Sequence, residues 1–270
     1  MLGLFDSGVG GLTVVKELLR WAPNASFVYL GDTARVPYGN KSPETITRYA
    51  LENTAFLVGK GATAVAVACN TVSSVAMDAL RATFPAVRFF DVVQPTVQAA
   101  VEAVRHGKAK RPSIGVIGTR ATVNSGIYER QLVSHAVKAG IANLAVYSSA
   151  CPLFVPLVEE NWMRRPEAKR IVRTYLATIR QKQVDVLILG CTHYPLLATI
   201  IKASLPSRVA FVDSPRAMLD RIAAELPELL TESAAPTQDL FFSDVTPHVE
   251  QIASRWLRRP VQAKQATLGG

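Results

Sequence analysis

Two cysteines occupy the positions in this sequence that are best placed for chemistry. Cys69 ends the apolar run that starts at Ala64, and Cys191 ends a similar run that starts at Val184. Continuous runs of small and β-branched apolar residues predict strands that are buried on both faces, as in a parallel sheet. Ligands of such sheets bind beyond the carboxyl ends of the strands. Both thiols are therefore expected where a substrate would bind.

Cys69 is followed by Asn70 and Thr71, which open a predicted helix. Backbone N–H groups at a helix N-terminus favour negative charge, and so they favour a thiolate over a thiol. We expect the pKa of Cys69 to fall from its ordinary value of about 8.5 toward neutrality.

Three kinds of chemistry could use these thiols. A zinc site could take Cys69, Cys191 and His193, but a Cys-x-His pair is not a usual ligand spacing and no fourth ligand is evident, so we predict no metal. A cysteine hydrolase could use Cys191 with His193 as its base, which would leave Cys69 without a role. Two thiols on opposite sides of one carbon could instead remove a proton from one side and deliver one from the other. The remaining cysteine, Cys151, is predicted to be a small core residue.

The segments around the two cysteines repeat along the chain. A strand expected at Leu2–Phe5 precedes the first cysteine strand, and a strand expected at Ser113–Gly118 precedes the second. This pattern predicts an α/β protein of two related domains with mainly parallel sheets, a pseudo-twofold relation and an active site in the interdomain cleft.

The domain boundaries follow from where the repeat begins and ends. We assign residues 1–93 and 207–270 to the first domain, and residues 94–206 to the second. The basic, breaker-rich segment Gly107–Pro112 is a candidate crossing between the domains. The last residues, Gln262–Gly270, are expected to be frayed.

The composition limits the class of protein. The chain has 270 residues, of which 49% are hydrophobic, yet no apolar run approaches the ~18 residues that span a bilayer. There is no secretory signal pattern, and three cysteines without a CxxC pair do not form a disulfide framework. We therefore expect a cytoplasmic protein that has no membrane partner.

The formal net charge is +9, and the basic residues concentrate in three stretches. These are Arg105–Arg111, Arg164–Lys182 and Arg255–Lys264. The middle stretch has the apolar spacing of an amphipathic helix, so its cations are predicted to form a solvated face. No zinc-finger or ribonucleoprotein motif accompanies them, and nucleic acid is not the expected ligand. A more modest interpretation than nucleic-acid binding is that this positive charge steers an anionic substrate toward the protein.

Several motifs together resemble the bacterial glutamate racemases of the aspartate/glutamate racemase family. They are Asp6–Gly11 (DSGVGG), Gly31–Gly39 (GDTARVPYG), Ala68–Thr71 (ACNT), Gly118–Thr122 (GTRAT) and Gly190–Leu196 (GCTHYPL). They follow one another in the order that the family has, and the combination is far more specific than any one motif. The resemblance extends from the first strand to about Asp213.

The resemblance implies a cofactor-independent interconversion of L- and D-glutamate, which supplies D-glutamate for peptidoglycan. It also implies a small-molecule substrate and a homodimer. One alternative is aspartate racemase, although the Thr-His-Tyr-Pro run after Cys191 is more similar to the glutamate enzymes. Another alternative is a basic binding protein without catalytic activity.

The resemblance also implies roles for particular residues. Cys69 and Cys191 would be the acid/base pair, with Asp6 assisting the first cysteine and His193 the second. Glu159 resembles a family glutamate near the second cysteine. The substrate would be held by Asp6, Ser7, Tyr38, Gly39, Asn70, Thr71, Thr119, Thr122, Thr192 and His193. Family members commonly have glycine after the acidic pair Glu159-Glu160, where this chain has Asn161-Trp162.

Overall fold

The computed structural model describes residues 1–107, 111–230 and 235–269. The chain separates into two compact units. Unit 1 comprises Met1–Val92 with Pro215–Gly270, and unit 2 comprises Val93–Ser214. Each unit has its own sheet, in which all the strand pairs are parallel.

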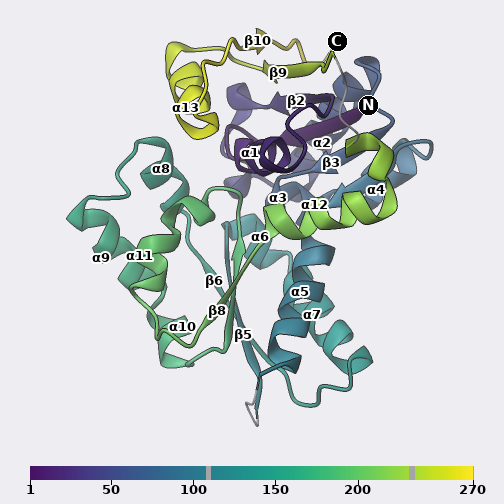
Figure 1. Cartoon of the computed structure of the whole chain (residues 1–270). Coiled ribbons are helices and arrows are strands. Elements are labelled where there is room, and N and C mark those ends of the chain that lie inside the picture. The colour runs from purple at the N-terminus through teal and green to yellow at the C-terminus, as the bar shows by residue number, and fades with distance from the viewer. Residues whose placement is uncertain (108–110, 231–234, 270) are drawn as a thin grey trace. The chain divides into compact units, whose positions relative to one another are not determined.

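Unit 1 is built on a sheet with the strand order β10-β9-β2-β1-β3-β4 (Figure 1). Its strands are β1 (Leu2–Asp6), β2 (Phe27–Gly31), β3 (Ala64–Val67), β4 (Arg88–Asp91), β9 (Gln238–Phe242) and β10 (Lys264–Gln265). The central strands β1, β2 and β3 are buried along their whole length, as their continuous apolar sequences predict.

Helices and short 3-10 turns cover this sheet. They are α1 (Leu12–Trp21), η1 (Thr33–Arg35), η2 (Tyr38–Asn40), α2 (Pro43–Gly59), α3 (Asn70–Val75), α4 (Met77–Thr83), α12 (Ser214–Glu225), η4 (Pro227–Leu230) and α13 (Pro247–Leu257). Helix α1 packs against α13, and α2 packs against α3 and α4. The start of α2 is fixed locally, because Ser42 Oγ accepts a hydrogen bond from Thr45 N at 3.3 Å and Pro43 occupies the first turn.

Unit 2 is built on a sheet with the strand order β6-β5-β7-β8. Its strands are β5 (Ser113–Gly118), β6 (Ala145–Ala150), β7 (Val186–Gly190) and β8 (Ala210–Asp213). The helices and the 3-10 turn of this unit are α5 (Val93–Arg105), α6 (Arg120–Asn124), α7 (Ile127–Lys138), α8 (Phe154–Glu159), α9 (Pro166–Tyr175), α10 (Ala177–Gln181), η3 (Tyr194–Leu197) and α11 (Ala198–Lys202).

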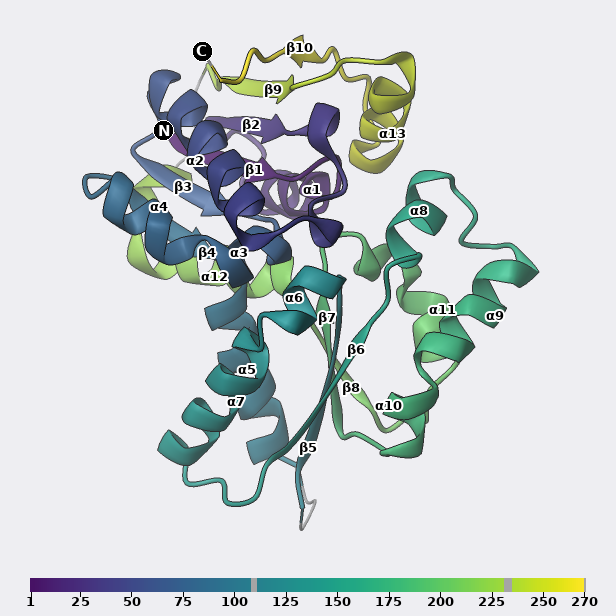
Figure 2. The same cartoon turned by 180° about the vertical axis from the view of Figure 1, so that it is seen from behind.

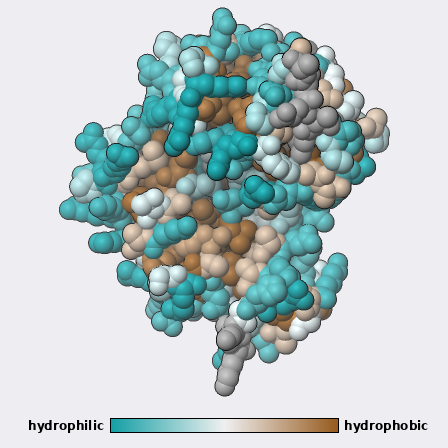
Figure 3. Space-filling view, in the orientation of Figure 1, coloured by the Kyte–Doolittle hydropathy of each residue, from teal (hydrophilic) through white to brown (hydrophobic). Residues whose placement is uncertain are grey.

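The helices of unit 2 lie on both faces of its sheet. Helices α5 and α7 are on one side, and α9, α10 and α11 are on the other (Figure 2). Side chains of α5, α7, β5 and β7 form a shared hydrophobic core that includes Val97, Leu132, Ile114 and Ile188. Edge strand β8 is less covered: its Phe211 and Val212 are half-buried. Figure 3 shows hydrophobic residues gathered at the surface of unit 2 between α11 and α5.

The two sheets share one topology. In unit 1 the strands β1 to β4 are ordered β2-β1-β3-β4, and in unit 2 the strands β5 to β8 are ordered β6-β5-β7-β8. The first strand of each set is flanked by the second and the third, and the fourth lies beyond the third. The predicted fold class, two related α/β halves with parallel sheets, is confirmed at this level.

One unit boundary lies within a residue of the predicted position, and the other differs. The first falls at Val92/Val93 against the predicted 93/94, so that α5 belongs to unit 2 and Gly107–Pro112 is not the crossing. Residues 108–110 of that segment lie outside the described residues. The second boundary falls at Ser214/Pro215 rather than at 206/207, because β8 pairs with β7 in the sheet of unit 2.

Two local predictions also need correction. The basic stretch Arg164–Lys182 forms two helices, α9 and α10, rather than one. The end of the chain is not frayed throughout, because Lys264 and Gln265 pair with Phe241 and Phe242 to extend the sheet of unit 1.

Candidate active site

Unit 1 places the first predicted cysteine beside the loop that follows β1. Strand β3 pairs with β1, so Cys69 and Ser7 follow neighbouring carboxyl ends. The Cys69 thiol donates a hydrogen bond to Ser7 Oγ at a sulfur–oxygen distance of 3.5 Å. Cys69 is only 4% exposed, and it directly precedes helix α3. Two residues that the motifs singled out are therefore in direct contact.

The pKa of Cys69 is shifted upward, whereas the sequence predicted a downward shift. Burial, together with the nearby charge of Asp6, raises the pKa of the thiol to about 12. Hydrogen bonding with Ser7 and with the backbone of Val72 lowers the pKa, but by less than burial and Asp6 raise it. Helix α3 begins at Asn70, as predicted, yet the desolvation of the thiolate outweighs the helix N-terminus. Cys69 is accordingly a thiol at neutral pH.

Asp6 is held at the end of β1 by a tightly packed glycine loop. Gly8 N donates to Asp6 Oδ2 at 3.2 Å, and the buried Tyr29 hydroxyl donates to the Gly8 carbonyl at 2.8 Å. A Cβ atom on Gly11 would come within 2.6 Å of Asp6 Cβ and 2.9 Å of the Tyr29 ring. Only glycine fits at position 11, because Asp6 and Tyr29 approach its backbone so closely. This close packing holds the Asp6 carboxylate beside the Cys69 thiol.

Tyr38 and Gly39 form the start of turn η2, which packs beside α3. Both residues are buried, as are Asn70 and Thr71 in the first turn of α3. The Tyr38 hydroxyl donates to Asp32 Oδ2 and accepts from Asn53 Nδ2. Burial and the Asp32 charge raise the pKa of Tyr38 well above its ordinary value, so the phenol stays protonated.

Unit 2 places the second cysteine in an equivalent position after β7. Cys191 is 7% exposed, and Thr192 and His193 are also buried. Cys191 Sγ lies 3.8 Å from His193 Nδ1, and Thr192 Oγ1 lies 3.5 Å from the same nitrogen. The other ring nitrogen, His193 Nε2, lies 2.8 Å from Glu159 Oε1. The structure therefore joins a thiol, an imidazole and a carboxylate in one chain of contacts.

His193 is strongly shifted toward its charged form. Burial opposes that form, but contacts with Cys191 and Glu159 outweigh it and raise the pKa of His193 to about 10. An imidazolium at this position can donate a hydrogen bond to a thiolate at Cys191. The two cysteines thus have neighbours of opposite charge, Asp6 for Cys69 and His193 for Cys191.

The threonines that follow β5 line the neighbouring strand end. Thr119 caps α6, because its Oγ1 accepts from Thr122 N at 3.2 Å. The two hydroxyl oxygens lie 3.0 Å apart. Since β5 pairs with β7, both hydroxyls belong to the same carboxyl edge as Cys191. Side chains of this kind can hold a carboxylate without placing a fixed positive charge in the site.

Asn161 shows how the loop after Glu159 tolerates a residue other than glycine. Its φ angle is +58°, in the left-handed region. Glycine adopts that region without cost, and asparagine is among the residues that tolerate it best. The change from the family pattern therefore leaves the end of α8 and the Glu159–His193 contact intact.

Cys151 behaves as the predicted core residue. It is fully buried after β6, and its Sγ lies 3.7 Å from the Ser149 carbonyl. Burial raises the pKa of its thiol to about 12. Its carbonyl accepts a hydrogen bond from the buried Tyr194 hydroxyl at 2.9 Å. Its contacts are those of a packing residue.

Sequence reasoning missed Asp32 as a site residue, although the signal that singled out the cysteines was present. Asp32 directly follows β2, at the carboxyl edge that also carries Asp6 and Cys69. Its carboxylate is fully buried and bonded to Arg35, Tyr38 and Ser243. Ser243 gave no signal, since it comes from the distant end of the chain.

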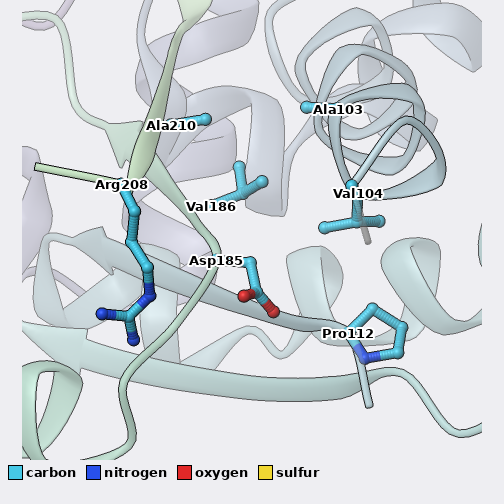
Figure 4. Close-up of a pocket in the computed structure, with 8 residues that line it drawn as sticks. Ala103, Val104, Pro112, Asp185, Val186, Arg208 and Ala210 are labelled. Atoms are coloured by element: carbon cyan, nitrogen blue, oxygen red, sulfur yellow. The ribbon is translucent and has the colours of Figure 1, made fainter. Parts of the chain in front are cut away.

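A cavity elsewhere in unit 2 contains none of the predicted site residues. It has a volume of about 220 Å³ and is lined by Ala103, Val104, Gly107, Pro112, Asp185, Val186, Arg208 and Ala210 (Figure 4). Asp185 precedes β7, whereas Cys191 follows that strand. The cavity is therefore at the amino-terminal edge of the sheet and is not the place where Cys191 lies.

The described parts of the chain contain neither a cluster of metal ligands nor a membrane-crossing helix. Across 1–107, 111–230 and 235–269, no three histidine, cysteine or acidic side chains come together as ligands of a metal ion would. In the same residues, every helix is too short or too polar to cross a membrane.

The fold and the placement of the polar groups define the class. Each unit is a parallel α/β sheet with a buried thiol and hydroxyl groups at its carboxyl edge, which is where α/β enzymes bind their substrates. The chain belongs to the Asp/Glu/Hydantoin racemase family, whose model matches residues 6–222.

Individual relatives cover nearly the whole chain. A glutamate racemase of Aquifex aeolicus is 44% identical over 263 residues, which span 97% of this chain and 96% of the relative. The crystal structure of a Bacillus anthracis glutamate racemase isoform has a TM-score of 0.89 at 32% identity, and covers 99% of this chain and 97% of that one. The Francisella tularensis glutamate racemase, solved in complex with D-glutamate, has a TM-score of 0.86 at 32% identity, and covers 98% and 97%.

Proposed function

We propose that the protein interconverts L- and D-glutamate without a cofactor, by acid/base catalysis at Cys69 and Cys191. The observation that carries the proposal is the repeated placement of the two thiols. Cys69 follows β3 and Cys191 follows β7, and these strands hold the same place in the two sheets. The choice of glutamate is supported by the glutamate racemases that resemble this chain along nearly all of its length.

In the proposed reaction one thiolate removes the Cα proton and the opposite thiol delivers another. The thiolate becomes a thiol as the Cα carbanion forms, and the carbanion then takes the proton of the second thiol. The Cys69 thiol, with its pKa raised to about 12, begins as the proton donor. Cys191, 3.8 Å from a protonated His193, begins as the base. In the opposite direction the thiols exchange roles, and Asp6 takes up the Cys69 proton, which neutralises the carboxylate whose charge holds the pKa of the thiol high.

The substrate is held by neutral groups in this proposal. In unit 1 these are Ser7, Asn70 and Thr71, with the backbone of Tyr38 and Gly39 on turn η2. In unit 2 they are Thr119, Thr122 and Thr192. Hydroxyl, amide and backbone groups can satisfy two carboxylates and an ammonium by hydrogen bonding. Burial of the thiols excludes water, which strengthens each of these interactions during proton transfer.

Circular dichroism with purified protein tests the function. L-glutamate should lose its signal until a racemic mixture remains, while L-aspartate should keep its signal. Racemisation of aspartate alone would make the protein an aspartate racemase. Loss of neither signal would support the remaining alternative, a basic binding protein without catalytic activity.

We further infer the setting of this activity. The D-glutamate would serve peptidoglycan synthesis, the enzyme would act in the cytoplasm, and it would be a homodimer, as the resemblance to glutamate racemases implies. Sedimentation at several protein concentrations tests the oligomeric state. Fractionation of cells that produce the protein tests its location.

A further inference from the structure

Asp32 is a buried carboxylate with contacts to two distant parts of unit 1. It directly follows β2 and is fully buried. An ionised group in that position is costly unless it is paired and hydrogen-bonded. The structure supplies partners to both of its oxygens, and they come from different segments.

One oxygen of Asp32 holds the loop that leads to the predicted substrate residues. Arg35 Nε donates to Asp32 Oδ2 at 2.7 Å, and the Tyr38 hydroxyl donates to the same oxygen. Arg35 lies in η1 and Tyr38 begins η2, so a single carboxylate oxygen links both turns of the loop. The loop is therefore tied at two points to the end of β2.

The other oxygen of Asp32 is bound from the C-terminal part of the chain. Ser243 Oγ donates to Asp32 Oδ1 at 2.7 Å, and the same hydroxyl oxygen accepts from Ala34 N at 2.9 Å. Ser243 directly follows β9, which pairs with β2. Its own backbone N–H donates to the Gly31 carbonyl at 3.0 Å. Strand β9 thus places the Ser243 hydroxyl against the loop of residues 33–39, although more than 200 residues separate the two in the sequence.

A second set of contacts reinforces the first. Asn53 on α2 donates from Nδ2 to the Tyr38 hydroxyl at 3.1 Å and accepts at Oδ1 from Arg35 at 3.1 Å. Arg35 also pairs with Glu52 and lies over the Tyr49 ring, 4.0 Å from its centroid. Helix α2 therefore holds the same two loop residues from another side.

These contacts determine what Tyr38 can offer a substrate. A phenol has one proton to donate, and the proton of Tyr38 is directed to Asp32. One of its acceptor positions is taken by Asn53. Tyr38 therefore cannot use its hydroxyl proton on a substrate carboxylate while Asp32 holds it. Its side chain serves as an anchor for the loop that carries Gly39.

We propose that Asp32 and Ser243 are positioning residues for substrate binding, which together hold the loop of residues 33–39 in place for glutamate. This inference rests on the proposed function. A loop that is already fixed loses little conformational freedom when the substrate binds. A loop released from Asp32 would have to be ordered by the substrate, and the cost would appear in KM more than in kcat.

The test compares Ser243→Ala with Ser254→Ala in the full-length protein. Ser254 is a matched control, since its Oγ also accepts a backbone N–H, that of Val261 at 3.0 Å, and it lies outside the Asp32 contacts. Ser243→Ala should raise KM for glutamate by ~3- to 10-fold, with a smaller change in kcat, because one hydrogen bond to a charged group is lost. Ser254→Ala should leave both constants unchanged.

A second measurement does not need substrate. Hydrogen–deuterium exchange of peptides that cover residues 33–40 should be faster in Ser243→Ala and in Asp32→Asn than in the wild type, and unchanged in Ser254→Ala. Tyr38→Phe combined with Ser243→Ala should raise KM by less than the product of the single effects, since both act through Asp32.

The outcomes separate the two proposals. If the wild type fails to racemise glutamate, the proposed function is wrong, and the exchange experiment still decides the role of Asp32. If the wild type is active but Ser243→Ala matches Ser254→Ala in both KM and loop exchange, the positioning role is wrong. Independent, fully multiplicative effects of Tyr38→Phe and Ser243→Ala would also overturn it.

Discussion

Glu159 and His193 are hydrogen-bonded at 2.8 Å, although 34 residues separate them in the chain. Helix α8 carries the carboxylate, and the segment after β7 carries the imidazole. The bond leaves His193 Nδ1 directed at Cys191 Sγ, 3.8 Å away. Glu159 thereby orients the imidazole beside the second thiol and, together with Cys191, favours its charged form.

Replacing Glu159 by glutamine should lower the pKa of His193 from about 10 toward its ordinary value, because the partner loses its charge. A raised histidine pKa stabilises the fold fully below the unfolded value of about 6.5, and this contribution is lost as the pH rises through 10. The unfolding free energy should therefore decline less between pH 7 and 10 in Glu159→Gln than in the wild type. Urea unfolding at several pH values measures this, with Glu160→Gln as the control.

Replacing Asp6 by asparagine should make Cys69 more reactive in the ligand-free protein. The Asp6 charge is one cause of the raised pKa of Cys69, so its removal lowers that pKa and increases the thiolate fraction. Mass spectrometry after iodoacetamide treatment at pH 8 would follow Cys69, with the fully buried Cys151 as an internal reference. Equal labelling of Cys69 in the two proteins would show that Asp6 does not influence the thiol.

Early turnover in heavy water should label one enantiomer first. Thiol protons exchange with solvent, so the donor thiol delivers deuterium while the proton taken by the other thiolate stays on its own side. Starting from L-glutamate, the D-product should carry deuterium at Cα and the recovered L-glutamate should remain largely protiated. Mass spectrometry after chiral separation measures both pools. Equal labelling at the earliest times would argue for a single base or an intermediate open to solvent.

Serine in place of either Cys69 or Cys191 should abolish racemisation, because a hydroxyl is too weak an acid to ionise near neutral pH. Cys151→Ser should keep its activity and lose only stability, by ~1–3 kcal/mol, since a hydroxyl would enter a buried apolar position. Racemisation rates and urea unfolding of the three variants separate these roles. Wild-type turnover by Cys69→Ser would contradict the two-thiol mechanism.

Alanine at position 161 should destabilise the protein by about 1 kcal/mol, because its Cβ is unfavourable in the left-handed region that Asn161 occupies. Glycine there should leave the stability within a few tenths of a kcal/mol of the wild type. Asn124, in α6, offers a control, since alanine is favoured at an exposed helical position. Urea unfolding compares the three variants. Equal stability of the alanine and glycine variants at position 161 would contradict the predicted conformational cost.

The sequence alone was sufficient for the architecture around the thiols. Continuous apolar runs before Cys69 and Cys191 predict buried parallel strands, because only a strand covered on both faces needs no polar alternation. The recurrence of the strand–cysteine pattern indicated two related halves, and the shared strand order confirms that relation. Ser42-Pro43 marked the start of α2, since capping depends on neighbours in the chain.

Only the tertiary structure determined which groups act on each other and with what charge. The helix N-terminus after Cys69 predicts a lowered pKa, but full burial and Asp6 reverse the sign, and neither is visible in the local sequence. The second unit boundary was likewise not visible in the local sequence. It depends on the pairing of β8 with β7, and helical residues separate these two strands in the chain. Pairing energies depend on which strands become neighbours, and a linear pattern does not specify that.

The Asp32–Ser243 contact shows the same limit most directly. Asp32 stands in a motif that the sequence made visible, yet its role depends on a serine 211 residues away. Strand β9 brings Ser243 to β2 because its apolar side chains complete the sheet of unit 1. Sequence patterns identify residues that could take part in catalysis when those residues directly follow a predicted strand in the chain. Burial, charge pairing and long-range hydrogen bonds arise only when the chain has folded.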